Sequence, residues 1–320
     1  MSSLIEQAAL RLQQLRQAGI EVPLDSGETA VVEAAPKPVT LPRHASVSPL
    51  AAAPPGPASR RIDLDFVALA ALGIITPDAP RTALADQFRV IKRPLIANAV
   101  GKGATGLKHA NLIMVTSALA GEGKTFNSVN LAMSIAAELD HTVMLVDADV
   151  ARPSVLRTLG LPMGPGLLDV LEGKVDLAGA LIKTNIDKLT LLPSGTPHPK
   201  ATELLASEAM KALLDDMATR YSDRIIIFDS PPLLLTTESR VLATHMGQIV
   251  MVVNAGQTSQ ADVTHALSTI ESCPIRLMIL NKARTDGPGG YGYGYGYGAY
   301  GYGHDHGDAE VPAETSAKPA

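Results

Sequence analysis

Short apolar runs, most of them rich in Val and Ile, recur through the middle of the chain. None alternates strictly between apolar and polar positions, which is typical of strands buried on both faces of a parallel sheet. Segments with helical spacing lie between these runs. The apolar runs are Leu112–Val115, Val143–Val146, Leu189–Leu192, Ile225–Phe228, Ile249–Val253 and Met278–Leu280, and the helical segments are Ser128–Leu139, Ala201–Tyr221, Glu238–Met246 and Gln260–Ser272. Because strand and helix alternate, the sequence predicts a doubly wound α/β domain with a mostly parallel sheet.

The two ends of the chain have a different pattern. Apolar positions from Leu4 to Leu15 recur at helical spacing, and a stretch rich in Pro and Ala follows from Val22 to Ser59. Prolines at this density exclude regular structure. Gly289 to Gly303 is almost wholly Tyr and Gly, a composition that builds no core. We therefore predict a helix and linker over residues 1–59, one α/β domain over 60–285, and a disordered tail over 286–320.

Composition narrows the class of protein. The 320-residue chain has a formal net charge of −5, which argues against a protein that works mainly by binding nucleic acid. Its single cysteine, Cys273, can form no internal disulfide, which suits a reducing compartment. No apolar run is long enough to cross a bilayer, and the N-terminus lacks the pattern of a secretory signal. We expect a cytoplasmic protein that reaches the membrane only through a partner.

A phosphate-binding motif lies between the first predicted strand and the helical segment after it. The residues are Ala118-Leu-Ala-Gly-Glu-Gly-Lys-Thr125. Gly121 and Gly123 allow the backbone to curl so that its N–H groups surround phosphate oxygens, and the next helix adds its positive end. We expect Lys124 to reach the β- and γ-phosphates of ATP and Thr125 to place its hydroxyl on Mg²⁺. The predicted ATP-binding residues are Ala120, Gly121, Glu122, Gly123, Lys124, Thr125 and Phe126.

Three aspartates end two of the other predicted strands. Asp147 and Asp149 follow Val143–Val146, and Asp229 follows Ile225–Phe228. Alternation along a strand projects Asp147 and Asp149 to the same side, at the sheet edge where ligands bind in this fold class. Carboxylates this close repel one another unless a cation or a proton lies between them. Magnesium binding and proton transfer are therefore expected here; the alternative is one helix-capping aspartate and one solvated aspartate.

Residues near the C-terminus add two further candidates. Asn281 follows the last predicted strand, and contact with the adenine base and a purely strand-ending role are both open. Six of the seven tyrosines lie in the Tyr/Gly segment, outside any predicted core. We interpret them as phosphate acceptors, against the alternative of a self-associating low-complexity segment. They are Tyr291, Tyr293, Tyr295, Tyr297, Tyr300 and Tyr302.

Together these motifs resemble the bacterial tyrosine kinases of exopolysaccharide synthesis, and most closely the exosortase-associated tyrosine autokinases. The resemblance runs from about Ala83 to Asn281 and takes in the first helix and the tyrosine cluster. It implies a P-loop NTPase-type fold and transfer of the ATP γ-phosphoryl to the C-terminal tyrosines. Lys124 and the three aspartates Asp147, Asp149 and Asp229 match the family's catalytic positions, and Thr125, Asp149 and Asp229 its magnesium site.

The resemblance also implies partners and an assembly. The family's oligomerisation motif is matched by Asp86, Arg89 and Lys92, which implies a ring of subunits. A membrane adaptor of the chain-length-determinant type would recruit the kinase to the inner face of the membrane, and a cognate tyrosine phosphatase would reverse its action. Two alternatives remain: a partition- or septum-type ATPase switch, although Leu119 stands where those proteins carry an extra lysine, and an ATP-binding scaffold without kinase activity.

Overall fold

The computed structural model describes residues 60–77, 80–104, 106–221 and 223–283. The predicted N-terminal helix and the tyrosine tail lie outside the described residues. One sheet of eight strands organises this part of the chain, in the order β1-β4-β5-β3-β6-β2-β7-β8. The strands are β1 (Arg60–Ile62), β2 (Leu112–Ser117), β3 (Thr142–Asp147), β4 (Ile182–Thr184), β5 (Leu189–Leu192), β6 (Arg224–Asp229), β7 (Gln248–Asn254) and β8 (Ile275–Asn281).

The sheet is parallel except at one pairing. β4 runs antiparallel to β5, and every other neighbouring pair is parallel. Every residue of β2 is buried, as the continuous apolar run predicted for a strand covered on both faces. The doubly wound, mostly parallel α/β class is therefore confirmed.

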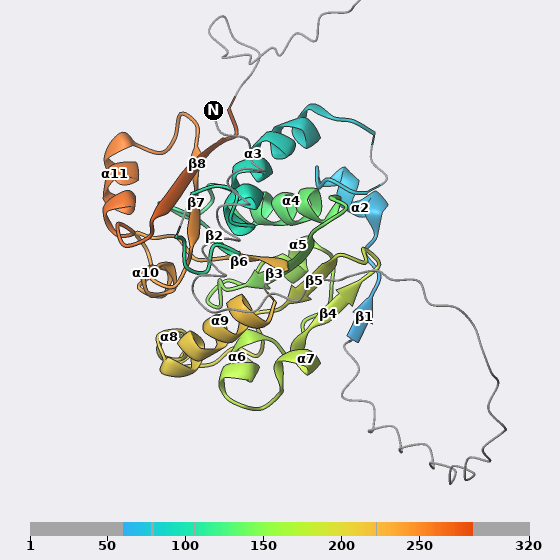
Figure 1. The fold of residues 1–320 in the computed structure, drawn as a ribbon, viewed down its shortest axis with the longest axis vertical. Helices are drawn as coiled ribbons and strands as arrows, with labels where there is room; N and C mark the ends of the chain where they lie inside the picture. The colour runs from blue at the N-terminus through green and yellow to red at the C-terminus, as the bar shows by residue number, and fades with distance from the viewer. Residues whose placement is uncertain (1–59, 78–79, 105, 222, 284–320) are drawn as a thin grey trace, which may run out of the picture. The chain divides into compact units, whose positions relative to one another are not determined.

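Helices cover both faces of this sheet, and Figure 1 shows them as two layers with the strands between. On one side α4 packs against β2, β3 and β6, and α3 packs on α4. The helices on this side are α2 (Phe66–Ala71), α3 (Ala83–Ala99), α4 (Lys124–Ala136) and α5 (Val155–Thr158), and those on the other side are α6 (Leu167–Leu171), α7 (Leu177–Ala180), α8 (Ala201–Leu205), α9 (Glu208–Arg220), α10 (Glu238–Ala243) and α11 (Gln260–Ser268).

Two buried clusters of apolar side chains fill the spaces between the layers. One contains Phe88 and Leu95 of α3 together with Leu131 of α4. The other contains Leu214 of α9 and Phe228 of β6. Because strands β2, β3 and β6 contribute side chains to both clusters, they form the rigid centre from which the functional loops project.

One predicted helix is divided in the structure. The segment Ala201–Tyr221 forms α8 and α9, separated at Ser207. The Ser207 hydroxyl accepts a hydrogen bond of 3.2 Å from the Met210 amide and so caps a new helix. Apolar spacing continues across this break, which is why the periodicity alone did not reveal it. No helix in the described part of the chain is both long and apolar enough to span a bilayer.

Candidate functional site

The phosphate-binding motif forms a tight loop between β2 and α4. Gly121 and Gly123 have φ angles of 80° and 100°, which residues with a Cβ rarely adopt. Gly123 is also the residue before α4, and no side chain caps this end of the helix. The N–H groups at the start of α4 therefore remain available to an anion at the positive end of a 13-residue helix.

Side chains from the neighbouring strands hold this loop in place. The buried Glu122 carboxylate accepts hydrogen bonds from the Leu119 amide at 2.7 Å and from the Thr258 hydroxyl. At the end of β8, the Asn281 amide donates to the Glu122 carbonyl at 2.8 Å, and Lys282 donates to the Gly121 carbonyl at 2.9 Å. The loop is therefore shaped before any ligand binds, and Asn281 has a role in shaping it.

Two hydroxyl groups of α4 meet the carboxylate at the end of β6. Thr125 donates to Asp229 at 2.6 Å, and Ser128 donates to the other carboxylate oxygen at 2.9 Å. Ser154 lies 2.7 Å from the Thr125 hydroxyl. Asp229 is fully buried, and this burial raises its pKa to about 6 although both hydroxyls and Lys124 favour the charged form. The structure thus brings together Thr125 and Asp229, two of the predicted metal-binding residues.

Asp147 lies beside Asp229 because the two residues are register partners on adjacent strands. One oxygen, Oδ2, accepts hydrogen bonds from the amides of Ser154 and Val155 at 3.0 and 2.9 Å. Asp147 therefore does cap α5, which was the alternative role. Its other oxygen, Oδ1, is buried and has no hydrogen-bond partner among the described residues. Burial and then the charge of Asp229 raise the pKa of Asp147 to about 7, against the opposing effect of the two amides.

Asp149 and Lys124 complete the group. Asp149 is 8% exposed and accepts a hydrogen bond from the Arg152 amide at 3.1 Å, so it is not the solvated residue of the alternative interpretation. Burial raises its pKa, while the charge of Lys124 opposes the shift. Lys124 is 9% exposed, and its ammonium group forms no hydrogen bond or ion pair with the described residues. Its charge acts to lower the pKa of both Asp149 and Asp229, and its free hydrogen-bonding capacity leaves it able to bind an anion.

The hydroxyl and carboxylate oxygens of this site suit a small hard cation. No group of three or more His, Cys, Asp and Glu side chains positioned to hold a metal ion occurs within the described ranges. Magnesium, however, binds proteins through only one or two carboxylates and takes its remaining ligands from substrate phosphates and water. The Thr125 hydroxyl and the Asp229 carboxylate, which lie 2.6 Å apart, fit that requirement.

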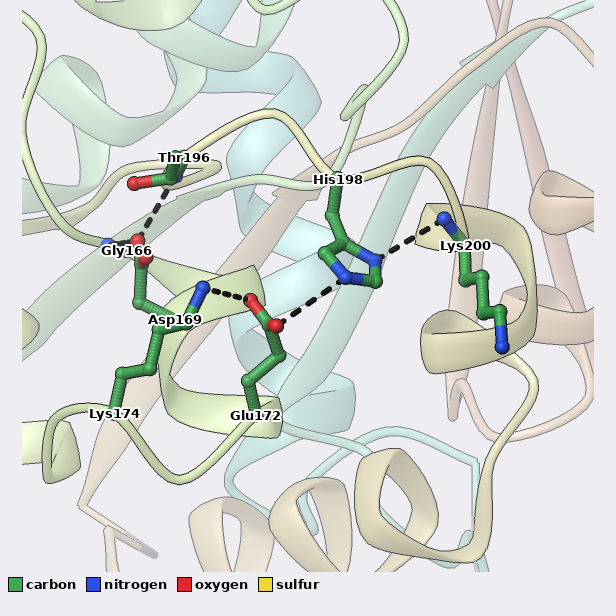
Figure 2. A network of polar contacts seen from close by, with 7 residues as sticks. All are labelled: Gly166, Asp169, Glu172, Lys174, Thr196, His198 and Lys200. Carbon is green, nitrogen blue, oxygen red and sulfur yellow. Dashed lines mark hydrogen bonds and ion pairs between the residues drawn. The ribbon is translucent and has the colours of Figure 1, made fainter.

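A second loop follows β5, which is parallel to β3, so this loop lies at the same edge of the sheet. Figure 2 shows that the Asp169 carboxylate holds this loop to the start of α6. Its Oδ2 accepts the amides of Gly166 and Thr196, both at 2.9 Å. Burial tends to raise the pKa of Asp169, but the amides of Thr196 and Gly166 outweigh it and lower the pKa.

Glu172 extends this network toward the start of α8 (Figure 2). Its carboxylate lies 2.8 Å from the Lys174 ammonium and 3.3 Å from Nε2 of His198. Nδ1 of His198 accepts the Lys200 amide at 3.1 Å, which places the ring proton on Nε2, facing Glu172. In α8, the Thr202 hydroxyl donates to Glu238 of α10 at 2.6 Å. The loop after β5 is thus tied to both neighbouring helices.

Some predicted residues lie elsewhere or outside the described ranges. Asp86 and Arg89 form an exposed ion pair of 2.7 Å on α3, distant in sequence from the phosphate loop. Lys92 is 5% exposed and binds the Ser134 carbonyl and Glu138 within the chain. Phe126 packs on the α3–α4 side of the core, so its contribution to ATP binding would come from its backbone. The six tail tyrosines lie outside the described residues.

Three polar residues of the site were missed from the sequence: Ser128, Ser154 and Thr258. Each contacts a residue at least 29 positions away, so no local pattern marks it. Ser128 alone carried a usable signal, because it lies one turn after Lys124 on the same face of α4.

Comparison with known proteins agrees with this geometry. A family model described as an AAA domain matches residues 110–280, more than half of the chain. Tyrosine-protein kinase YwqD of Bacillus subtilis is 30% identical over 205 residues, which cover 64% of this chain and 83% of that protein. Tyrosine-protein kinase wzc of Salmonella typhi is 31% identical over 173 residues, covering 53% of this chain and 24% of that protein.

A solved structure supports the same relationship. The crystal structure of the chimerical protein CapA2B2 matches with a TM-score of 0.54 and 25% identity, over 69% of this chain and 93% of that one. The family is therefore established both by sequence and by fold. The chain carries an AAA domain and belongs to the bacterial tyrosine-protein kinases.

Proposed function

We propose that this kinase transfers the γ-phosphoryl group of ATP to its own C-terminal tyrosines. The observation that carries the proposal is the convergence of Lys124, Thr125, Asp147 and Asp229 where β2, β6 and β3 end side by side. A cationic group, a hydroxyl and two carboxylates in one buried place match the parts that phosphoryl transfer requires.

In this proposal each residue has a defined role toward ATP. The loop amides and Lys124 bind the phosphates, and the ammonium group neutralises charge that develops on the transferred group. Magnesium, held by Thr125, Asp149 and Asp229, would supply further neutralisation of that charge. Thr125 and Asp229 are already positioned, because the hydrogen bond between them joins the loop to β6. Asn281 stays a candidate for the adenine contact beside its role in holding Glu122.

Asp147 is the proposed acceptor of the tyrosine proton. Its Oδ2 is fixed by two amides, which leaves Oδ1 to face a substrate hydroxyl. A pKa of about 7 suits a general base that works near neutral pH. The phenol oxygen would form the new bond to phosphorus as ADP departs, and the proton would pass to Asp147.

The tail tyrosines are within reach of this site. Asn281 ends β8, and β8 is parallel to β7 and β2, so the tail starts from the same edge of the sheet as the phosphate loop. The ten residues from Asn281 to Tyr291 extend to at most roughly 35 Å. That length permits transfer within one chain or to a neighbour. The resemblance favours transfer between subunits of a ring.

The proposed setting is the control of exopolysaccharide polymerisation and export. A chain-length-determinant-type adaptor would recruit the kinase to the membrane, and a cognate phosphatase would reset the tail. Of the predicted ring contacts, Asp86 and Arg89 are exposed on α3, whereas Lys92 is buried and would act by supporting α3. Division of the chain into residues 1–59, 60–285 and 286–320 remains part of the proposal.

The experiment is phosphosite mapping by mass spectrometry after incubation with Mg·ATP. We expect phosphate on the six tail tyrosines and none on Tyr221, whose ring stacks on the Arg224 guanidinium at 4.7 Å. A variant with all six tail tyrosines changed to Phe is the matched control, and it should stay unlabelled. Phosphate found only on Tyr221, or on serine or threonine, would refute the tail as acceptor.

A further inference from the structure

The strand β8 lies at one end of the sheet and has an open edge. It pairs with β7 alone among the described residues. Figure 1 shows it as the last strand on the side of α11. An open edge presents unpaired N–H and C=O groups and readily accepts another strand. This edge is seven residues long, which is long enough for a stable pairing.

One face of β8 is also apolar and uncovered. Met278 and Leu280 are 60% and 64% exposed. Their register partners on β7 are Met251, which is fully buried, and Val253. Helix α11 and its neighbours thus cover β7 on this face and leave β8 bare. Arg276 is exposed on the same face, two residues before Met278.

The chain that continues from β8 has a sequence that matches this surface. Tyr291, Tyr293, Tyr295 and Tyr297 alternate with glycines, so in an extended strand all four rings lie on one face. No charged residue occurs between Gly287 and Gly303. The connection before Tyr291 contains Gly287, Pro288, Gly289 and Gly290, which favour a reversal of the chain.

We propose that, before phosphorylation, the first part of the tyrosine tail adds antiparallel to β8 as a ninth strand and shields its tyrosines. Tyr291 and Tyr293 then lie opposite Leu280 and Met278, and Tyr295 lies over the Arg276 guanidinium. The tail of the same chain is the occupant, because a connection of about ten residues gives it a millimolar effective concentration at this edge.

This inference rests on the proposed function of the tail tyrosines and adds a control on it. Shielded hydroxyls cannot enter an active site, so docking slows the first transfer. Each phosphate adds about −1.5 to −2 charges, which the apolar strip cannot accept. A tail that has been phosphorylated therefore stays released, and later transfers to the same tail are faster than the first.

Tyrosine fluorescence reads the docking directly, because the chain contains no tryptophan and six of its seven tyrosines lie in the tail. The measurement is acrylamide quenching of dephosphorylated protein without ATP, in a Tyr221→Phe background. With Tyr291, Tyr293 and Tyr295 docked, about half of the emission should be shielded. In the Met278→Lys/Leu280→Lys variant nearly all of it should become accessible, and initial autophosphorylation should be faster.

The matched control is Val67→Lys/Leu139→Lys, which changes two side chains that are 82% and 87% exposed elsewhere on the domain. Acrylamide should quench its tyrosine fluorescence to the same extent as that of the unmodified chain. Equal quenching of the β8 variant and the control would overturn the proposal. Shielding that disappears on dilution would also overturn it, because the tail would then belong to a second copy. The quenching is measured without ATP, so its outcomes are independent of whether the tail is the kinase's acceptor.

Discussion

Two buried aspartates at the same edge of the sheet have pKa values that are shifted in opposite directions. Asp147 is 1% exposed and Asp169 is 4% exposed, and each accepts two backbone amides through a single oxygen. Yet the pKa of Asp147 is raised to about 7, whereas that of Asp169 is lowered. Amide donors are therefore not what distinguishes them.

The difference lies first in burial, which is the largest cause of the raised pKa of Asp147 but is outweighed at Asp169, and then in the neighbouring charges and in what remains unpaired. Asp147 faces Asp229 across adjacent strands, and its Oδ1 has no partner in the described part of the chain. Asp169 has Lys174 nearby, and the second carboxylate of its network, Glu172, is bound to Lys174 and His198. Around Asp147 the carboxylates repel one another, and a cationic ligand would relieve that repulsion. Around Asp169 the negative charges already have cationic partners. That contrast distinguishes a functional site from a structural one.

The largest expected effect comes from removing the unpaired ammonium group. Lys124→Met should lower autophosphorylation by at least about 100-fold, because it deletes the charge that faces the transferred phosphate. The measurement is the initial rate of phosphotyrosine formation, with the fold checked by circular dichroism. Lys174→Met in the structural region is the control, since its ion pair with Glu172 is exposed and should leave the rate nearly unchanged. Wild-type labelling by the Lys124 variant would show that the loop assignment is wrong.

The next effect separates magnesium dependence from nucleotide affinity. Asp149→Asn and Asp229→Asn should each reduce turnover by roughly 10- to 1,000-fold and raise the magnesium concentration that is needed. Binding of ADP without magnesium should change little, because the proposed partner of these carboxylates is the metal. Titration calorimetry with and without magnesium makes the distinction. Equal loss of ADP affinity in both conditions would contradict these roles.

A third prediction concerns stability, and its sign differs between the two regions. Burial raises the pKa of Asp147 from 3.8 to about 7, so ionisation of this group costs the folded state on the order of 4 kcal/mol. That cost is absent below about pH 4, grows between about pH 4 and 7, and is complete above about pH 7. Asp147→Asn should therefore stabilise the ligand-free protein at pH 8, with no gain at pH 4, in urea unfolding followed at both values.

Asp169→Asn should do the reverse. The pKa of Asp169 is lowered, so its charged form contributes stability above the ordinary carboxylate pKa and loses it as the pH falls below about 4. The variant should be less stable by about 1–3 kcal/mol at pH 7, with the difference shrinking in acid. If both variants shift stability in the same direction at pH 8, the comparison fails.

The smallest effect is expected at the rim of the structural region. Glu172→Gln removes the contacts with Lys174 and His198, whose side chains are 53% and 27% exposed. Exposed ion pairs of this kind contribute less than about 1 kcal/mol. The free energy of unfolding should therefore change little, and so should the kinase rate. A large loss of activity would indicate that the loop after β5 contacts the substrate.

The sequence predicted the centre of the fold better than its margins. The strands β2, β3 and β6 carry continuous apolar runs, which are typical of strands buried on both faces. Strands β1 and β4 have three residues each, too few for any pattern. Helix α3 was also missed, and it carries Pro94 in its interior, which ordinarily argues against a helix.

For the site, the sequence predicted the residues that belong to motifs, but not the residues that form hydrogen bonds with them. Asp147 and Asp229 end apolar strands, and Lys124 and Thr125 begin the helix after the loop that follows β2, so strand order places all four at one edge. The Asp169 network depends on Gly166, whose Cβ, if it had one, would overlap the backbone of Pro193 and Gly195. Such a contact between distant segments leaves only a glycine in the sequence, and many glycines have other causes.

The most direct test of the account follows ADP and phosphotyrosine together in one reaction. If the site passes phosphate to the tail, the two products should appear in a 1:1 ratio up to six phosphotyrosines per chain, and ADP formation should then stop. The variant with six tail Phe substitutions should form almost no ADP. Continued release of ADP without matching phosphotyrosine would contradict the central claim, because the site would then transfer phosphate to water as an ATPase does.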